Sequence, residues 1–242
     1  MKRKAIQLAN QTLVVSLPSK WVKEQGIKKG DEIDIEERGR ELIIGNKGKI
    51  EETKKIINIE EFGIMKNRIV LSNYLKGLDE LEIRFTKPDQ VEEIKNRVIN
   101  ELIGFEIVKQ TPNSLILKEI ADSSDQSFEI ILRRIFLIMM SNSEELLNSL
   151  KENKRNLDHI ISTDLTINKL CYYCIRILNK RGYKNYREIP MIYSLILTLE
   201  NIGDVHKNIA KEIIEGKLKL KKEDLENLEL SNELICILET NH

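Results

Sequence analysis

Two carboxylates, Glu200 and Asp204, lie four residues apart in a segment with helical apolar periodicity. At this spacing both side chains project from one face of a helix, and Asn208 continues the row. Oxygen donors grouped in this way are what hard cations such as Mg²⁺ and Ca²⁺ prefer. A row of charged and polar side chains is also typical of an ordinary solvated helix surface. The spacing alone leaves both interpretations open.

A third acidic residue, Asp164, falls within the apolar stripe of the preceding predicted helix, beside Asn168. Burying an unpaired carboxylate costs several kcal/mol, so we expect Asp164 to have a partner. The partner would be a cation, a helix N-terminus, or an arginine such as Arg133 or Arg134.

The sequence offers no recognisable catalytic group. Cys171 and Cys174 form a lone CxxC within a helical pattern, where small core residues are a more common explanation than a zinc site. His206 falls on the apolar side of its helix and is expected to be a packed core histidine. No Ser/His/Asp or Cys/His grouping stands out, so the sequence predicts that the protein is not an enzyme. Three cysteines without a paired framework favour a reducing, cytoplasmic location.

Charge is unevenly distributed along a chain whose 39 basic and 39 acidic side chains cancel. Residues 1–30 carry seven Lys or Arg and one acid, Glu24, whereas residues 31–45 carry six acids and two bases. The zero net charge excludes a histone-like protein, and the longest apolar run is too short to span a membrane. The basic stretch is either a surface that binds a polyanion or a solvated face.

The first forty-five residues are predicted to form four short strands and one short helix. Leu13, Val15 and Leu17 alternate with other residues as in a strand, and Pro18 ends it. A helix follows over 20–25, then an amphipathic strand around Ile33 and a closing strand over 41–44. So small a unit without Cys or His needs a partner chain, which predicts a dimer.

This stretch resembles the AbrB/MazE/SpoVT swapped-hairpin domain. The segments SLPSKWV and GIKKGDEIDI and the closing hairpin strand occur in the family's order. The resemblance implies that two chains interleave into one DNA-binding β-barrel. It also implies that phosphates are contacted by a set of basic and polar residues, namely Arg3, Lys4, Gln7, Gln11, Lys20 and Lys23. Some members of the family use the unit mainly to dimerise, and that alternative stays open.

Residues 50–121 are predicted to form a small layered α+β domain. The order is β-α-β-α-β-β with the helices on one face. Strands are expected over 54–59, around Leu81–Phe85, over 105–110 and over 115–120, and helices over 61–76 and from Pro88 to Gly104. Its role is either that of a spacer or of a ligand sensor.

Residues 124–242 are predicted to form an antiparallel helix bundle, with long helices over 125–150, 153–181 and 186–215 and a shorter one over 222–239.

The segment TLENIGDVHKNIAKEI resembles the signature helix of the PhoU family, and ISTDLTINKLCYYCIRILNKRG resembles the helix before it. The resemblance implies a metal site with Asp164, Glu200 and Asp204 as ligands, and an oxygen-rich set suits magnesium, calcium, manganese or iron. It also implies signalling of phosphate status. The chain has room for one three-helix repeat where the family has two, so the partner chain of a homodimer is expected to supply the second.

Together these expectations describe an α+β multidomain chain with a dimeric head (1–47), a middle domain (50–121) and a PhoU-like bundle (124–242). The domain order resembles that of archaeal regulators, which implies a cytoplasmic DNA-binding transcriptional regulator of phosphate uptake, without membrane insertion. Two alternatives remain: a signalling adaptor on a phosphate transporter whose head only dimerises, and an antitoxin-like module.

Overall fold

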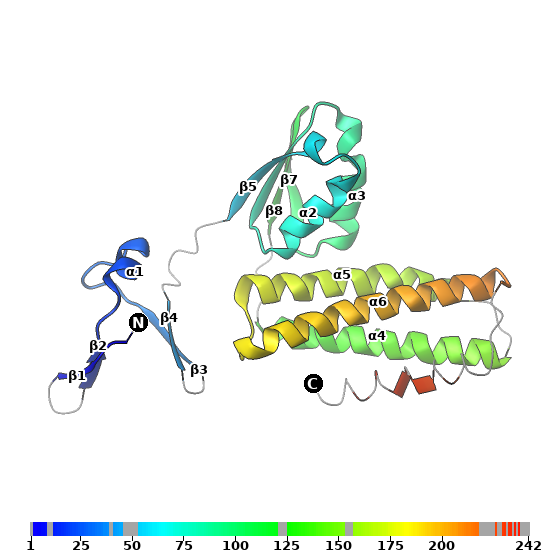
Figure 1. Ribbon diagram of the computed structural model, residues 1–242. Coiled ribbons are helices and arrows are strands. Elements are labelled where there is room, and N and C mark those ends of the chain that lie inside the picture. The colour runs from blue at the N-terminus through cyan, green and yellow to red at the C-terminus, as the bar shows by residue number, and fades with distance from the viewer. Residues whose placement is uncertain are drawn as a thin grey trace. The chain divides into compact units, whose positions relative to one another are not determined.

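The computed structural model describes residues 2–8, 12–38, 41–45, 53–120, 125–152 and 157–217, together with seven positions between 226 and 237. The chain divides into two compact units, residues 1–51 and residues 52–242 (Figure 1). We call them the head and the body. The expected middle domain and helix bundle therefore lie within one unit. In the described part of the chain, no helix is both long and apolar enough to cross a membrane.

The head consists of two antiparallel hairpins and a short helix. Strands β1 (Ala5–Leu8) and β2 (Thr12–Val15) pair in one sheet, and β3 (Asp34–Arg38) and β4 (Glu41–Gly45) pair in another. Helix α1 (Ser19–Glu24) follows Pro18 and ends before Gly26, whose φ of 65° breaks the helix. The predicted strands and helix are thus confirmed, although β2 ends at Val15, before Leu17, and β3 begins one residue after Ile33. The predicted barrel is not found in the described residues of this single chain, because each sheet has only two strands.

The first half of the body is a four-stranded sheet with helices on one face, as predicted. The strands are β5 (Lys54–Asn58), β6 (Glu80–Arg84), β7 (Phe105–Gln110) and β8 (Ser114–Glu119), in the order β5-β6-β8-β7. Strands β5 and β6 run parallel and the other pairs are antiparallel. Leu81 and Ile83 of β6 lie opposite Leu117 and Leu115 of β8, and all four are buried.

The first helix of the predicted middle domain begins later than expected. Residues Ile59–Met65 form a 3-10 segment, and helix α2 spans only Lys66–Leu75. Gly63, with φ 47° and ψ −122°, interrupts the helical backbone there. The second helix likewise opens with a 3-10 turn, Pro88–Val91, before α3 (Glu92–Glu101).

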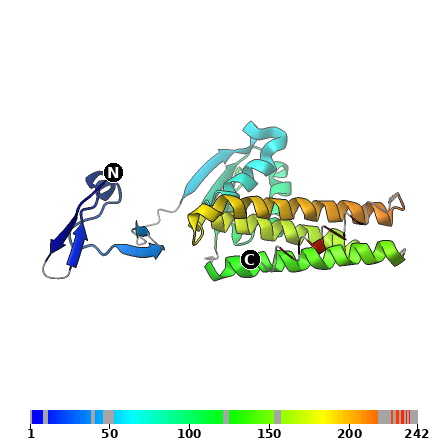
Figure 2. The same cartoon turned by 60° about the horizontal axis from the view of Figure 1, so that its bottom comes forward.

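The second half of the body contains three long antiparallel helices, α4 (Asp125–Glu152), α5 (Asp158–Arg181) and α6 (Ile189–Ile214) (Figure 2). A 3-10 turn, Tyr186–Glu188, precedes α6. The described positions of the expected last helix are helical, and Ile235 among them is buried. The rest of 222–239, like 153–156, lies outside the described residues.

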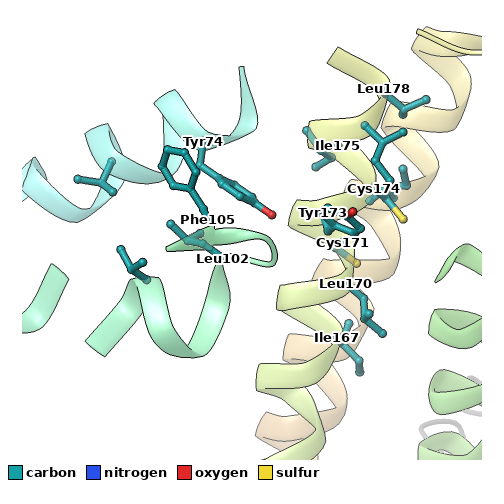
Figure 3. Close-up of a cluster of buried hydrophobic side chains, with 14 of the residues drawn as sticks. Tyr74, Leu102, Phe105, Ile167, Leu170, Cys171, Tyr173, Cys174, Ile175 and Leu178 are labelled. Carbon is teal, nitrogen blue, oxygen red and sulfur yellow. The ribbon is translucent and has the colours of Figure 1, made fainter. Parts of the chain in front are cut away.

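The sheet, the two shorter helices and the bundle form successive layers of the body. Helices α2 and α3 pack on the sheet and also contact α5, so one hydrophobic core runs from β6 through to α6. Figure 3 shows Tyr74, Leu102 and Phe105 facing the α5 residues around Cys171 and Tyr173. Packing of this kind joins the two halves of the body into one unit.

Candidate functional site

The basic residues predicted to bind DNA are solvent-exposed in the head. Arg3 and Lys4 directly precede β1, and Lys20 and Lys23 lie on α1. Lys20 makes a 3.8 Å ion pair with Glu24, and both side chains are largely exposed, so this pair holds Lys20 only weakly. These four cationic side chains are therefore accessible to a polyanion.

Of the two glutamines also predicted to contact DNA, the structure describes one. Gln7 is exposed on β1, opposite Leu13 of β2 in the hairpin register. Gln11 lies outside the described residues.

The head leaves its apolar side chains in solvent. None of the described residues between 2 and 45 is buried. In the first hairpin, Ile6 and Leu8 lie on one face and Leu13 and Val15 on the other, and each is at least 56% exposed. A two-stranded hairpin with apolar residues on both faces is not stable by itself in water. The head is therefore incomplete as a single chain.

The three carboxylates predicted as metal ligands gather on the body around one lysine. The Lys207 Nζ atom donates to Asp164 Oδ2 at 2.9 Å and also forms an ion pair with Asp204. Asp164 is buried, so the predicted need for a partner is met by Lys207. The predicted alternatives Arg133 and Arg134 are both exposed on α4.

Glu200 completes this acidic group and is shifted toward its protonated form. Burial, reinforced by the negative charges of Asp204 and Asp164, raises the pKa of Glu200 above its usual value. Burial opposes the charged form of Lys207, but its hydrogen bonds to Asp204 and Asp164 outweigh that effect and raise its pKa. Lys207 therefore places a positive charge among the carboxylates predicted to bind a metal ion.

The fit of the group to a metal ion is correspondingly poor. Two of the three predicted ligands already accept hydrogen bonds from Lys207. Among the residues that the structure describes, no group of three or more His, Cys, Asp or Glu is arranged to hold a metal ion. The arrangement is that of an ion-pair network linking α5 to α6.

The bundle interior also holds polar side chains. Asn142 of α4 donates to Thr163 Oγ1 of α5 at 2.9 Å, and His206 of α6 is 1% exposed. Neither ring nitrogen of His206 has a hydrogen-bond partner, and burial lowers its pKa to about 4. The prediction of a packed core histidine is thus confirmed.

The two helical cysteines are also core residues. Cys171 and Cys174 are buried free thiols, and burial raises the pKa of Cys171 to about 12. Their burial agrees with the prediction, from their helical spacing, that they are small core residues.

Arg176 on α5 links the bundle to the sheet layer through several polar contacts. Its side chain is 2% exposed, and its Nη1 and Nη2 atoms donate to the backbone oxygens of Tyr74 at 2.6 Å and Leu78 at 2.8 Å. Nη2 also lies 3.2 Å from Glu119 Oε1, and the guanidinium stacks on the rings of Tyr74 and Phe105. Arg176 thereby satisfies carbonyl groups at the C-terminus of α2, where a cation is favoured by the helix dipole.

Lys180, one turn beyond Arg176, extends the same contact. It forms ion pairs with Asp79 and with Glu119. Burial alone would favour the protonated form of Asp79, but hydrogen bonds from Lys180 and Thr53 outweigh it and lower the pKa of Asp79 to about 2. Gly77 allows the close approach, because a Cβ atom there would lie 2.9 Å from Lys180 Cβ.

Three cationic residues in these contacts were not predicted from the sequence: Arg176, Lys180 and Lys207. A signal was present for Arg176, since it is the one charged residue in the apolar run from Leu170 to Leu178. A lone charge at a core position predicts a dedicated partner. Lys207 carried no comparable signal, because it sits within a mixed charged segment.

Comparison with known proteins identifies part of the head. Residues 6–52 match the family described as "Antidote-toxin recognition MazE, bacterial antitoxin". No curated protein and no solved structure is detectably similar to the chain. The match covers both described hairpins and α1, and stops where the body begins. The chain therefore carries a MazE/AbrB-like head on a body that these comparisons assign to no family.

Proposed function

We propose that the protein is a dimeric DNA-binding transcriptional regulator whose head contacts DNA. The observation that carries this proposal is the MazE-like head, with exposed Arg3, Lys4, Lys20 and Lys23 around apolar hairpins that one chain leaves open. Domains of the MazE/AbrB kind typically bind DNA and dimerise. A second head covers the apolar strands and doubles the number of cationic side chains facing the duplex.

Lysine and arginine contacts to phosphate would supply most of the affinity. They position the protein on the duplex but carry no sequence information directly. Sequence preference then depends on polar side chains such as Gln7 and on the shape of the groove. In this proposal the two hairpins complete a swapped-hairpin barrel when the second chain is present.

We further propose that the regulated process is phosphate uptake. This finer assignment is supported by the resemblance of the α6 segment around Glu200 and Asp204 to the PhoU signature helix. The body would then sense phosphate status, and a head that serves only as a dimeriser would make the chain an adaptor on a phosphate transporter. Binding of a phosphate-transport promoter fragment in preference to a scrambled duplex distinguishes these two roles.

The match of the head to an antitoxin family favours a second candidate, an antitoxin-like module. In that case the protein would neutralise a toxin as well as bind DNA. Co-expression with the product of an adjacent small gene tests it: restored growth of cells poisoned by that product would support this candidate, and unrestored growth would count against it.

The main proposal is tested by a charge-matched pair of variants in fluorescence anisotropy. Replacing Arg3, Lys4, Lys20 and Lys23 by Gln removes four charges per chain from the head. The control removes four exposed lysines from the body, namely Lys76, Lys87, Lys109 and Lys211. We expect the head variant to lose at least about 100-fold in affinity for a promoter duplex at moderate salt, and the control variant to change little. Equal losses in both variants would contradict a head-centred interface.

A further inference from the structure

One stretch of the body is strongly basic. Residues 165–187 contain six Lys or Arg and no Asp or Glu, in a chain with 39 acidic residues. The one other acid-free stretch of this length is residues 1–23 in the head, which carry five bases. The basic stretch of the body completes α5 and forms the loop that leads into α6.

Three of these six cations are exposed, and they lie at or beside the loop. Arg176 and Lys180 are already bound to groups of the sheet layer, and Lys169 is half-buried. We call the three exposed residues the loop cations: Arg181, Lys184 and Arg187. The side chain of Lys184 is 80% exposed, and its ion pair with Glu129 is long, at 3.9 Å, so it holds Lys184 only weakly.

Two acidic side chains lie beside the loop cations without cancelling their charge. Glu129 on α4 accepts a hydrogen bond from the Tyr183 hydroxyl at 2.8 Å, and Glu188 accepts one from Asn185 Nδ2 at 2.7 Å. Both carboxylates are half-buried, whereas all three loop cations are exposed. The surface of the loop is therefore positive.

The charge of the whole bundle is also separated along its length. Gly203 of α6 packs against Ile167 of α5, and Asn142 of α4 contacts Thr163 one turn away, so these contacts divide the bundle into two halves. The half that contains the loop carries eight bases and four acids, over residues 125–138 and 169–201. The other half carries four bases and eight acids, over residues 139–152, 157–168 and 202–217. Figure 1 shows the loop at the end of the bundle where α4 begins.

The chain from the head enters the body beside this basic half. Thr53, which precedes β5, donates from its backbone N and its Oγ1 to Asp79 Oδ2 at 2.7 Å and 2.9 Å. Asp79 in turn pairs with Lys180, which directly precedes Arg181 in the chain. The head is therefore tethered to the half of the body that carries the loop cations.

We propose that the loop cations contact phosphates of the DNA that flanks the site bound by the head. This inference rests on the proposed function, in which the head holds the chain on a duplex. Lys and Arg contact phosphates without reading base sequence, and the tether raises the effective concentration of flanking DNA around the basic half. The acidic half is repelled by the same phosphates, so the basic end of the bundle faces the duplex.

Fluorescence anisotropy of the full-length protein on two duplexes tests this contact. One duplex ends at the edges of the head's footprint on the promoter, and the other continues for about 15 base pairs on each side. Each flank is then about 50 Å long, more than the roughly 39 Å that the 26 residues of α6 span. The loop variant replaces the three loop cations by Gln. The control variant replaces three exposed lysines elsewhere on the body by Gln, namely Lys87, Lys109 and Lys211.

The loop cations of two chains make up to six contacts, which steepen the slope of log K against log salt by up to about 5 on the longer duplex. We expect the wild-type and control proteins to bind the longer duplex at least about tenfold more tightly than the shorter one at low salt. The loop variant should bind both duplexes alike, with an unchanged melting temperature. Lys184→Glu alone should remove at least about threefold of the gain.

Two results would overturn the contact while leaving DNA binding by the head intact. In one, the wild-type protein gains nothing on the longer duplex. In the other, the loop variant keeps the whole gain, or the control variant loses as much of it. If the wild-type protein binds neither duplex, the proposed function fails together with this inference.

Discussion

Replacing Arg176 by Met should weaken the contact between the bundle and the sheet layer and lower the free energy of unfolding of the body. The change removes two charge-assisted hydrogen bonds, to the carbonyls of Tyr74 and Leu78, and leaves Glu119 facing Lys180 alone. Each such hydrogen bond contributes about 1.5–3 kcal/mol, and breaking a buried ion pair costs about 3–5 kcal/mol. Because the Met side chain recovers part of the packing, we expect a net loss of about 4 kcal/mol in the free energy of unfolding.

Urea unfolding followed by far-UV circular dichroism measures this loss, since α4, α5 and α6 supply most of the helix. With a slope of about 2.5 kcal/mol per M, the midpoint should fall by about 1.5 M. Fluorescence of Trp21, the single tryptophan, reports on the head and should not shift. Exposed Arg68 on α2 supplies the control, Arg68→Met. A loss below about 1 kcal/mol in Arg176→Met would refute the assigned role of this side chain.

Three further perturbations address other parts of the body. Burial lowers the pKa of His206 to about 4 in the folded chain, below the unfolded value of 6.5, so the unfolded chain takes up the proton first as the pH falls. The free energy of unfolding should therefore fall by about 3 kcal/mol between pH 6.5 and pH 4, and by less in His206→Leu. Urea unfolding at each pH measures both. Lys207→Met should lower the free energy of unfolding by about 2 kcal/mol, whereas Lys211→Met at an exposed position should change it little. Mn²⁺ should raise the melting temperature of Lys207→Met but not that of the wild type. An equal rise in the wild type would mean that metal binds beside Lys207. Gly77→Ala should cost about 2 kcal/mol, since Gly77 has a positive φ and a Cβ atom there would lie 2.9 Å from Lys180 Cβ; an unchanged melting temperature would contradict that close approach.

Most helices and strands could be predicted from the sequence because the apolar residues of each element recur at the spacing typical of that element. Leu81 and Ile83 alternate in β6, and Gly77 and Gly104, both with positive φ, follow helices that end where expected. The 3-10 segment before α2 was missed, because the backbone of Gly63 adopts a conformation that apolar spacing does not encode.

Long-range pairing was harder to predict from the sequence. The structure brings Asp164 and Asp204 together on Lys207, a contact that depends on the register between α5 and α6 and that the sequence did not predict. The stacking of the sheet layer on α5 through Arg176 depends on residues about one hundred positions apart. The predicted barrel needs strands from a second chain and so lies beyond what one chain can display.

The most direct test of the central claim is the salt dependence of DNA binding by the wild-type protein. If Arg3, Lys4, Lys20 and Lys23 of two heads contact phosphates, up to about eight contacts form, and the slope of log K against log salt should approach about −7. Tight promoter binding with a slope steeper than about −4 is the result that our account predicts. Weak binding with a slope near zero, at equal affinity for promoter and scrambled duplexes, would contradict it.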